Sequence, residues 1–149
     1  MRRLSFRAAA VVVAVAVAGA GCSSTQATRA PLPPPPQVVH VTIDDHHYAY
    51  DTTIHAGRTV FVGHNVGRAT HTILLYAVGD DLPPVNVQIH GDKRHQVEGF
   101  AGTRVKPGAT NSFAVDLVPK QRYYMLDFDR DSDNKIFALD GLDSEFRTR

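Results

Sequence analysis

Residues 53–76, "TIHAGRTVFVGHNVGRATHTILLY", contain the clearest structural pattern of this 149-residue chain. In "TVFVGHN" two sets of side chains alternate: Val60, Val62 and His64 in one, Phe61 and Gly63 in the other. A period of two places successive side chains on opposite faces of a β-strand. "HTILLYAV" is a second short apolar run, and the turn signal Asn65–Gly67 separates it from the first. The stretch therefore predicts two consecutive strands joined by a short loop.

The rest of the chain from residue 37 onward repeats this pattern, and residues 37–149 have the size of one domain. "QVVHVTI" places Val39, Val41 and Ile43 on one face. Further short runs are "VNVQIH" (residues 85–90), "SFAVDLV" and "RYYMLDF", separated by turns rich in glycine and proline. No clear amphipathic helix appears. Seven or eight short strands at this spacing predict an all-β protein with a single β-sandwich, in which residues 85–90 are a strand.

The opening stretch resembles the middle of a cupredoxin, the blue-copper β-sandwich. That family typically shows a glycine turn, an alternating strand ending in asparagine, a short glycine loop, and a histidine that opens the next strand. In this chain the corresponding residues are Gly57, Thr59–His64, Asn65, Gly67 and His71. "VKPGATNSFAVDLVPKQRYYMLDF", residues 105–128, is similar to the family's closing hairpin. The resemblance covers most of residues 38–141 and implies a Greek-key β-sandwich of cupredoxin type.

The resemblance also implies a copper site that this chain does not complete. In the family, the loop after the penultimate strand supplies Cys, His and often Met, and an earlier histidine, matched here by His71, completes the site. Residues 124–141, "YMLDFDRDSDNKIFALDG", contain no Cys and no His. A blue-copper centre needs a thiolate, and the one cysteine of the chain is Cys22. We therefore predict a cupredoxin-like domain that has lost the type-1 copper site.

The acidic loop in this segment suggests a calcium site instead. Asp129, Asp131 and Asp133 occupy positions 1, 3 and 5 of a calcium-binding loop, and Asp140 occupies position 12. Calcium prefers such carboxylate oxygens. Asn134 replaces the usual glycine at position 6, and "RYYML" before the loop is typical of a strand rather than a helix. A solvated acidic loop without a metal is the alternative interpretation.

Histidine supports a second metal hypothesis, because imidazole suits Cu(II) and Zn. His64 and His71 flank one short loop and could converge, and the loop at residues 127–133 would add carboxylate oxygens. Taken together, the candidate ligands for Cu(II), Zn or Ca are His64, His71, Asp127, Asp129, Asp131, Asp133 and Asp140.

The N-terminus, "MRRLSFRAAAVVVAVAVAGAGC", has the features of a signal peptide. A basic segment precedes Ala8–Gly21, an uncharged stretch that is shorter than the roughly 20 residues needed to span a bilayer. The small residues before Cys22 resemble a bacterial lipobox, although Gly19 stands where the family usually has a larger aliphatic residue. We predict that residues 1–21 are a lipoprotein signal peptide and that Cys22 is lipidated; plain secretion is the alternative.

Residues 22–36 end in five prolines within Pro31–Pro36 and predict an extended linker. The formal charge of +1 becomes −2 when residues 1–21, with their three arginines, are removed. Neither this charge nor a membrane tether favours nucleic acid as a partner. The predicted location is the extracytoplasmic face of the cell membrane, held by the lipid anchor.

No sequence motif of a nucleophile elbow, a zinc protease or a phosphate-binding loop is found, so we do not predict an enzyme. The predicted function is that of a binding or interaction module at the cell envelope, with an envelope protein of unknown identity as the partner. The alternatives are a Cu(II) or Zn module that uses His64, His71 and residues 127–133, and a calcium-stabilised loop at residues 129–140.

Overall fold

The computed structural model describes residues 32–50, 53–91 and 99–149. The predicted signal peptide, Cys22 and the linker up to residue 31 lie outside the described residues. Residues 33–149 form one compact unit. Among the residues that the structure describes, no helix is long and apolar enough to cross a membrane.

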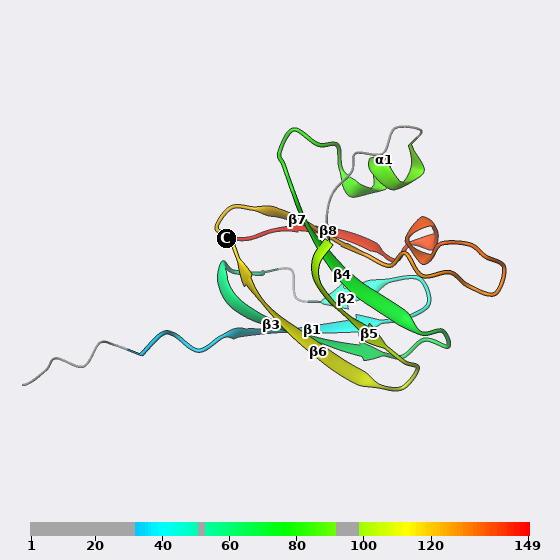
Figure 1. Ribbon diagram of the computed structural model, residues 1–149, viewed down its shortest axis with the longest axis horizontal. Coiled ribbons are helices and arrows are strands. Elements are labelled where there is room, and N and C mark those ends of the chain that lie inside the picture. The colour runs from blue at the N-terminus through cyan, green and yellow to red at the C-terminus, as the bar shows by residue number, and fades with distance from the viewer. Residues whose placement is uncertain (1–31, 51–52, 92–98) are drawn as a thin grey trace, which may run out of the picture. The chain divides into compact units, whose positions relative to one another are not determined.

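Eight strands form two four-stranded sheets that pack face to face (Figure 1). The first sheet has the order β2 (Tyr48–Tyr50), β1 (Gln37–Ile43), β3 (Gly57–Asn65) and β6 (Thr110–Leu117). The second has the order β5 (Gly99–Val105), β4 (His71–Val78), β7 (Arg122–Leu126) and β8 (Asp143–Arg147). β1 and β3 are parallel and the other pairs are antiparallel. The predicted all-β sandwich is confirmed.

In β1 and β3 of the first sheet, every second residue is buried, and these residues form the inner face of the sheet. Val39, Val41 and Ile43 of β1 are buried, as their spacing predicts. On β3, Phe61 and Gly63 point toward the second sheet. A Cβ atom at Gly63 would lie 2.6 Å from the Ile73 side chain, so the two sheets approach too closely here for a larger residue.

All five residues of β7 are buried, because this strand is covered on both faces. Its inner face joins the main core between the sheets. Its outer face packs under α1 (Val85–His90) and the short 3-10 helix η1 (Phe137–Asp140), and these elements build a second apolar cluster. The two clusters fix where β7 ends, and therefore where the loop after it begins.

The prediction of a strand at residues 85–90 is wrong, since this segment is helix α1. Val85, Val87 and Ile89 satisfy a period of two, but only Val85 and Ile89 are buried, four residues apart, while Val87 is 55% exposed. The preceding Pro84 leaves its carbonyl to accept hydrogen bonds from the N–H groups of residues 87 and 88. Two side chains four positions apart lie on the same face of a helix, and their burial against the outer face of the second sheet therefore favours the helix.

One end of the sandwich carries the turns that follow β1, β3, β5 and β7. We call it the loop end; its connections are residues 44–47, 66–70, 106–109 and 127–142. β1 begins at the opposite end, so its seven residues place the end of the linker about 20 Å from the loop end. Figure 1 shows the linker entering on the left and the loop after β7 projecting on the right.

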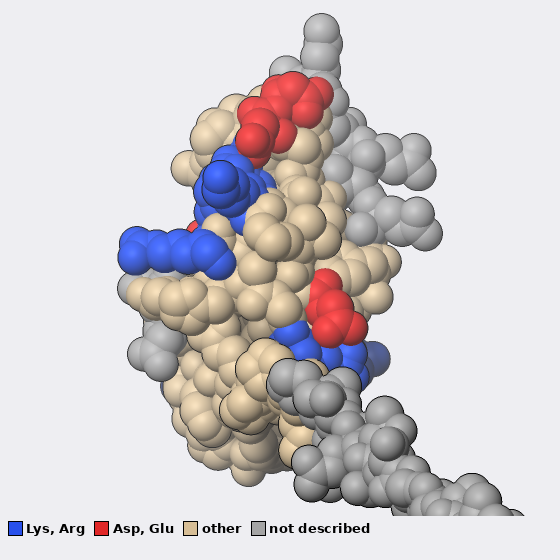
Figure 2. Space-filling view, turned by 90° about the vertical axis from the view of Figure 1, so that its left-hand side faces the viewer, with Lys and Arg blue, Asp and Glu red and all other residues tan. Residues whose placement is uncertain are grey.

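Figure 2 views the end at which the linker enters and shows basic and acidic side chains interspersed among uncharged ones. Two ion pairs lie at this end: Arg58 with Asp116 (3.0 Å) and Arg147 with Asp80 (2.6 Å). On this face, basic and acidic side chains of the described residues therefore occur together.

Candidate functional site

The centre of the loop end is a buried imidazole held between two carboxylates. His71, the first residue of β4, points into the sandwich and is 0% exposed. Its Nδ1 lies 2.9 Å from Oδ2 of Asp127, and its Nε2 lies 3.2 Å from Oδ1 of Asp45. An ionised carboxylate only accepts hydrogen bonds, so a ring placed between two ionised carboxylates donates from both nitrogens as an imidazolium.

Both carboxylates are held by further donors. Asp127, the residue after β7, accepts the backbone N–H of Thr72 at Oδ2 and that of Asp129 at Oδ1. Asp45, in the turn after β1, accepts the backbone N–H groups of Arg68 and Ala69. Each of these bonds favours the charged form of the carboxylate. We call these three residues, Asp45, His71 and Asp127, the ion cluster.

The directions of the pKa shifts of His71 and Asp45 agree with a protonated His71 and an ionised Asp45. Burial lowers the pKa of His71, but the hydrogen bonds and charges of Asp127 and Asp45 outweigh it, and the net pKa is raised above its ordinary value. Burial raises the pKa of Asp45, whereas its hydrogen bonds from Ala69, Arg68 and His71 lower it, and the net pKa falls. The ring of Phe137 packs edge-on against His71 at 4.5 Å and shields it from solvent.

The structure brings some of the predicted ligands together and separates others. Asp129 lies beside the ion cluster, where its Oδ2 accepts the Thr72 hydroxyl at 2.8 Å and pairs with Arg104 at 3.2 Å. His64 is exposed on the outer face of β3, and its Nδ1 lies 3.0 Å from the hydroxyl of Thr110. His64 therefore points away from the core that contains His71, and the expected convergence of these two rings does not occur.

The acidic loop is organised by its own backbone. Asp131 Oδ1 accepts the N–H groups of Asp133 and Lys135, at 2.9 and 2.8 Å. Asn134 has a φ of +64°, the left-handed conformation that asparagine tolerates in place of glycine. Asp140 pairs with Lys135 and with His46. Among the residues that the structure describes, no three His, Cys, Asp or Glu side chains form a group that could hold a metal ion.

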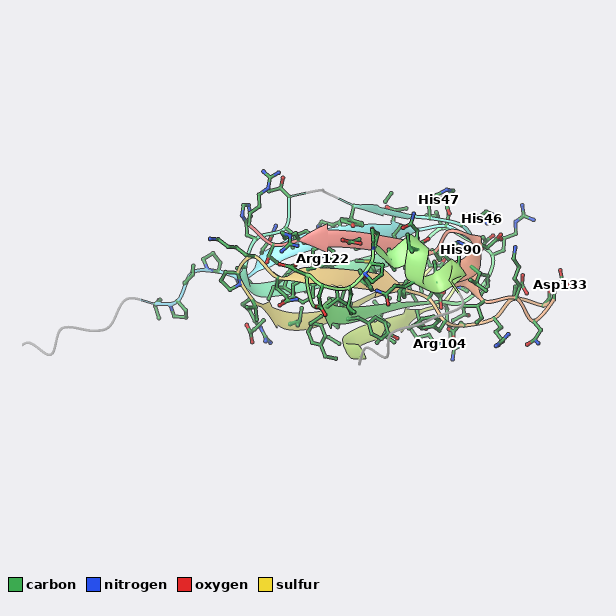
Figure 3. All side chains as sticks on the ribbon, turned by 90° about the horizontal axis from the view of Figure 1, so that it is seen from above. His46, His47, His90, Arg104, Arg122 and Asp133 are labelled. Atoms are coloured by element: carbon green, nitrogen blue, oxygen red, sulfur yellow. The ribbon has the colours of Figure 1, made fainter. Side chains whose placement is uncertain are left out.

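A cavity of about 510 Å³ opens next to the ion cluster. We call it the loop-end cavity; residues from three connections and from β5 line it, among them Asp45, Arg68, Arg104, Asp129, Arg130 and Asp131. Figure 3 shows His46, Arg104 and Asp133 at this end of the molecule. Asp45 and the arginines were not among the predicted site residues. Asp45, Arg68 and Arg130 lie in connections between strands and Arg104 lies on β5, and no local pattern singles them out.

No protein-family model matches the chain, and no curated protein matches it. Solved structures do match. Auracyanin B is 17% identical, with 79% of this chain and 93% of that chain covered and a TM-score of 0.54. A dithionite-reduced auracyanin from Roseiflexus castenholzii is 14% identical, with 76% and 97% covered and a TM-score of 0.50.

At these identities the similarity shows the fold. The domain is a cupredoxin-type β-sandwich, which confirms the resemblance found in the sequence. Its loop after β7, residues 127–142, carries no Cys, His or Met, so the residues present do not fit a blue-copper centre.

Proposed function

We propose that this protein is a lipid-anchored binding module of the cell envelope, in which the ion cluster has replaced the copper site of a cupredoxin fold. One observation carries the proposal: both ring nitrogens of His71 lie within hydrogen-bonding distance of carboxylate oxygens, 2.9 Å from Asp127 and 3.2 Å from Asp45, an arrangement that suits an imidazolium. A metal ligand needs a nitrogen lone pair, and an imidazolium has none. The histidine that would complete a copper site is thus engaged by the protein itself.

A metal would have to displace several interactions at once. Binding to His71 requires loss of its proton, whose pKa is raised by Asp127 and Asp45 against the effect of burial. It also requires one of the two carboxylate hydrogen bonds to break. His64 faces solvent on the other sheet and cannot contribute from there. The donor set therefore disfavours both Cu(II) and Zn, independently of the missing thiolate.

Binding is a better account than catalysis. The loop-end cavity is lined by charged and polar side chains, as a ligand site requires. Among the described lining residues, Thr70 and Ser132 carry hydroxyl groups, and neither is hydrogen bonded to a histidine, so neither is activated as a nucleophile.

The predicted lipid anchor supports a location at the membrane. Lipidation at Cys22 would tether the domain through the proline-rich linker, which enters at the end opposite the cavity. The cavity would then be presented away from the membrane, toward soluble ligands or an envelope protein.

Thermal melts of the purified full-length protein test the proposal. After chelator treatment, Cu(II), Zn(II) and Ca(II) are added separately. A ligand at 100 times its dissociation constant stabilises a fold by about 2.7 kcal/mol, which is several degrees for a domain of this size. We expect that no metal raises the melting temperature in a way that is lost when His71 is replaced.

Two outcomes would contradict the proposal. A shift with Cu(II) or Zn(II) that survives in His64→Ala but disappears in His71→Gln would restore the metal-binding alternative at His71. A shift with Ca(II) that disappears in Asp129→Asn would establish the calcium-stabilised loop.

A further inference from the structure

Three guanidinium groups from three different elements line the loop-end cavity. Arg68 lies in the connection between β3 and β4, Arg104 on β5, and Arg130 in the loop after β7. Segments up to 62 residues apart in the chain thus deliver the same chemical group to one cavity. All three residues are exposed.

Most of the donor capacity of these arginines is unused. Each guanidinium offers five N–H donors in a planar fork. Arg104 has one ion-pair contact, with Asp129, and Arg130 donates to the carbonyl oxygen of Asn134 at 2.6 Å. The guanidinium of Arg68 has no hydrogen bond or ion pair to any residue that the structure describes. The cavity therefore has open donor positions that suit a carboxylate, which matches the fork of arginine bidentately.

Some carboxylate oxygens that line the same cavity accept hydrogen bonds from described residues, and others do not. Oδ1 of Asp45 accepts three donors, from Arg68, Ala69 and His71. By contrast, Oδ1 of Asp129 and Oδ2 of Asp131 receive no hydrogen bond from any described residue, although their other oxygens do. These two oxygens are acceptors that suit the hydroxyl groups of a ligand.

We infer that the loop-end cavity binds a small hydroxylated carboxylate, the chemical class of the sugar acids. Arg68 and Arg104 hold the carboxylate, and Asp129 and Asp131 accept its hydroxyl groups. A cavity of about 510 Å³ accommodates a molecule of this size and is larger than a single inorganic anion needs. The four aspartates and three arginines of the lining leave a net charge of −1, so the hydroxyl contacts, and not charge alone, select the ligand.

This inference rests on the proposed function, because it assigns a ligand class to the same binding module. The test is isothermal titration of the chelator-treated, full-length protein with glucuronate at constant ionic strength. Acetate supplies the carboxylate alone, glucose the hydroxyl groups alone, and inorganic phosphate a bare anion. We expect glucuronate to bind at least tenfold more tightly than each of the other three.

The arginines are tested by substitution. Arg68→Gln and Arg104→Gln are each expected to weaken glucuronate binding about tenfold or more, since hydrogen bonds to charged groups are the strong ones. Arg58→Gln is the matched control: Arg58 pairs with Asp116 at the opposite end of the sandwich, and its replacement should leave the affinity unchanged. Because the Arg68 side chain has no described partner, Arg68→Gln should also keep the melting temperature of the wild type.

Several results would overturn the inference. Absence of glucuronate binding, equal affinity for acetate or phosphate, or an unchanged affinity in Arg68→Gln and Arg104→Gln would each do so. The metal titrations distinguish failure of the assigned ligand class from failure of the proposed function. A His71-dependent metal shift contradicts the binding module itself, whereas missing glucuronate binding without such a shift contradicts only the ligand class.

Discussion

At the scale of single residues, the distinguishing feature is His71, whose pKa is raised and which lies between two carboxylates inside the sandwich. Removing a charged ring from water is costly, and the cost is offset only when partners surround it. Asp45 and Asp127 supply these partners from two separate loops. The ion cluster therefore joins the turn after β1, the start of β4 and the end of β7.

We expect Asp127→Asn to destabilise the fold by about 3 kcal/mol, because removal of one partner leaves a buried charge uncompensated. Urea denaturation of wild type and variant measures the difference. Asp116→Asn is the matched control, since Asp116 lies on the surface and its pair with Arg58 should contribute within about 1 kcal/mol. Equal small effects of the two substitutions would show that the cluster is not charged.

The same cluster predicts a dependence of stability on pH. The pKa of His71 is raised in the folded state, because Asp127 and Asp45 outweigh burial. Its stabilising contribution is fully present below about pH 6.5, the pKa of an unfolded histidine, and is lost as the pH rises through the raised pKa. The pKa of Asp45 is lowered, so its contribution is present above about pH 3.9 and is lost as the pH falls through the lowered value.

Melting temperatures from pH 4 to pH 9 test this dependence. We expect the difference between wild type and Asp127→Asn to be largest near pH 5 to 6 and to shrink under alkaline conditions, where His71 is neutral in both. A difference that stays constant from pH 5 to pH 9 would contradict a protonated His71.

At the scale of elements, the contacts between η1 and the turn after β1 close the loop end. Gly141, which ends η1, has a φ of +109°, and a Cβ atom there would lie 2.5 Å from the carbonyl oxygen of His46. His46 in turn pairs with Asp140. The loop after β7 and the turn that carries Asp45 therefore pack directly on each other.

We expect Gly141→Ala to destabilise the protein by about 2–4 kcal/mol, combining the cost of a left-handed backbone with a clash against a rigid carbonyl. Gly108→Ala isolates the first cost, because Gly108 also has a positive φ, +70°, with open space around it. Denaturant unfolding of the two variants gives the comparison. A Gly141→Ala variant no less stable than Gly108→Ala would show that the two segments do not pack tightly.

The elements also show what could be predicted from sequence. β1 and β3 were found because each buries one face, which imposes a period of two. α1 was missed because its apolar residues fit either period until the outer face of β7 selects one. β2 and β8 have only three and five residues and β5 carries two glycines, so their sequences contain no long apolar run that would predict a strand.

The candidate site was predictable in part for a similar reason. His71 and Asp127 were found from their places beside strands, at positions that the family resemblance singles out. Asp45 contacts His71 across 26 residues, and no local pattern encodes that contact. Arg68 and Arg104 are likewise brought to the cavity by the packing of loops that only the folded structure defines.

At the scale of the whole molecule, β1 begins at the end of the domain opposite the loop-end cavity. We expect Cys22→Ser to move the protein from the membrane fraction to the soluble fraction and to abolish incorporation of labelled fatty acid. The domain itself should keep its melting temperature, since Cys22 precedes its first strand by 15 residues. Retention in the membrane fraction without any label in the wild type would contradict lipid anchoring.

The parallel pairing of β1 with β3, and the placement of β7 between β4 and β8, have a kinetic consequence. Neither β1–β3 nor β4–β7 can form as a simple hairpin, because each joins segments separated by other strands. Folds dominated by such non-local pairings reach the native state in milliseconds to seconds rather than microseconds. Because the ion cluster joins the turn after β1 to the start of β4 and the residue after β7, it can form only after these distant segments have come together.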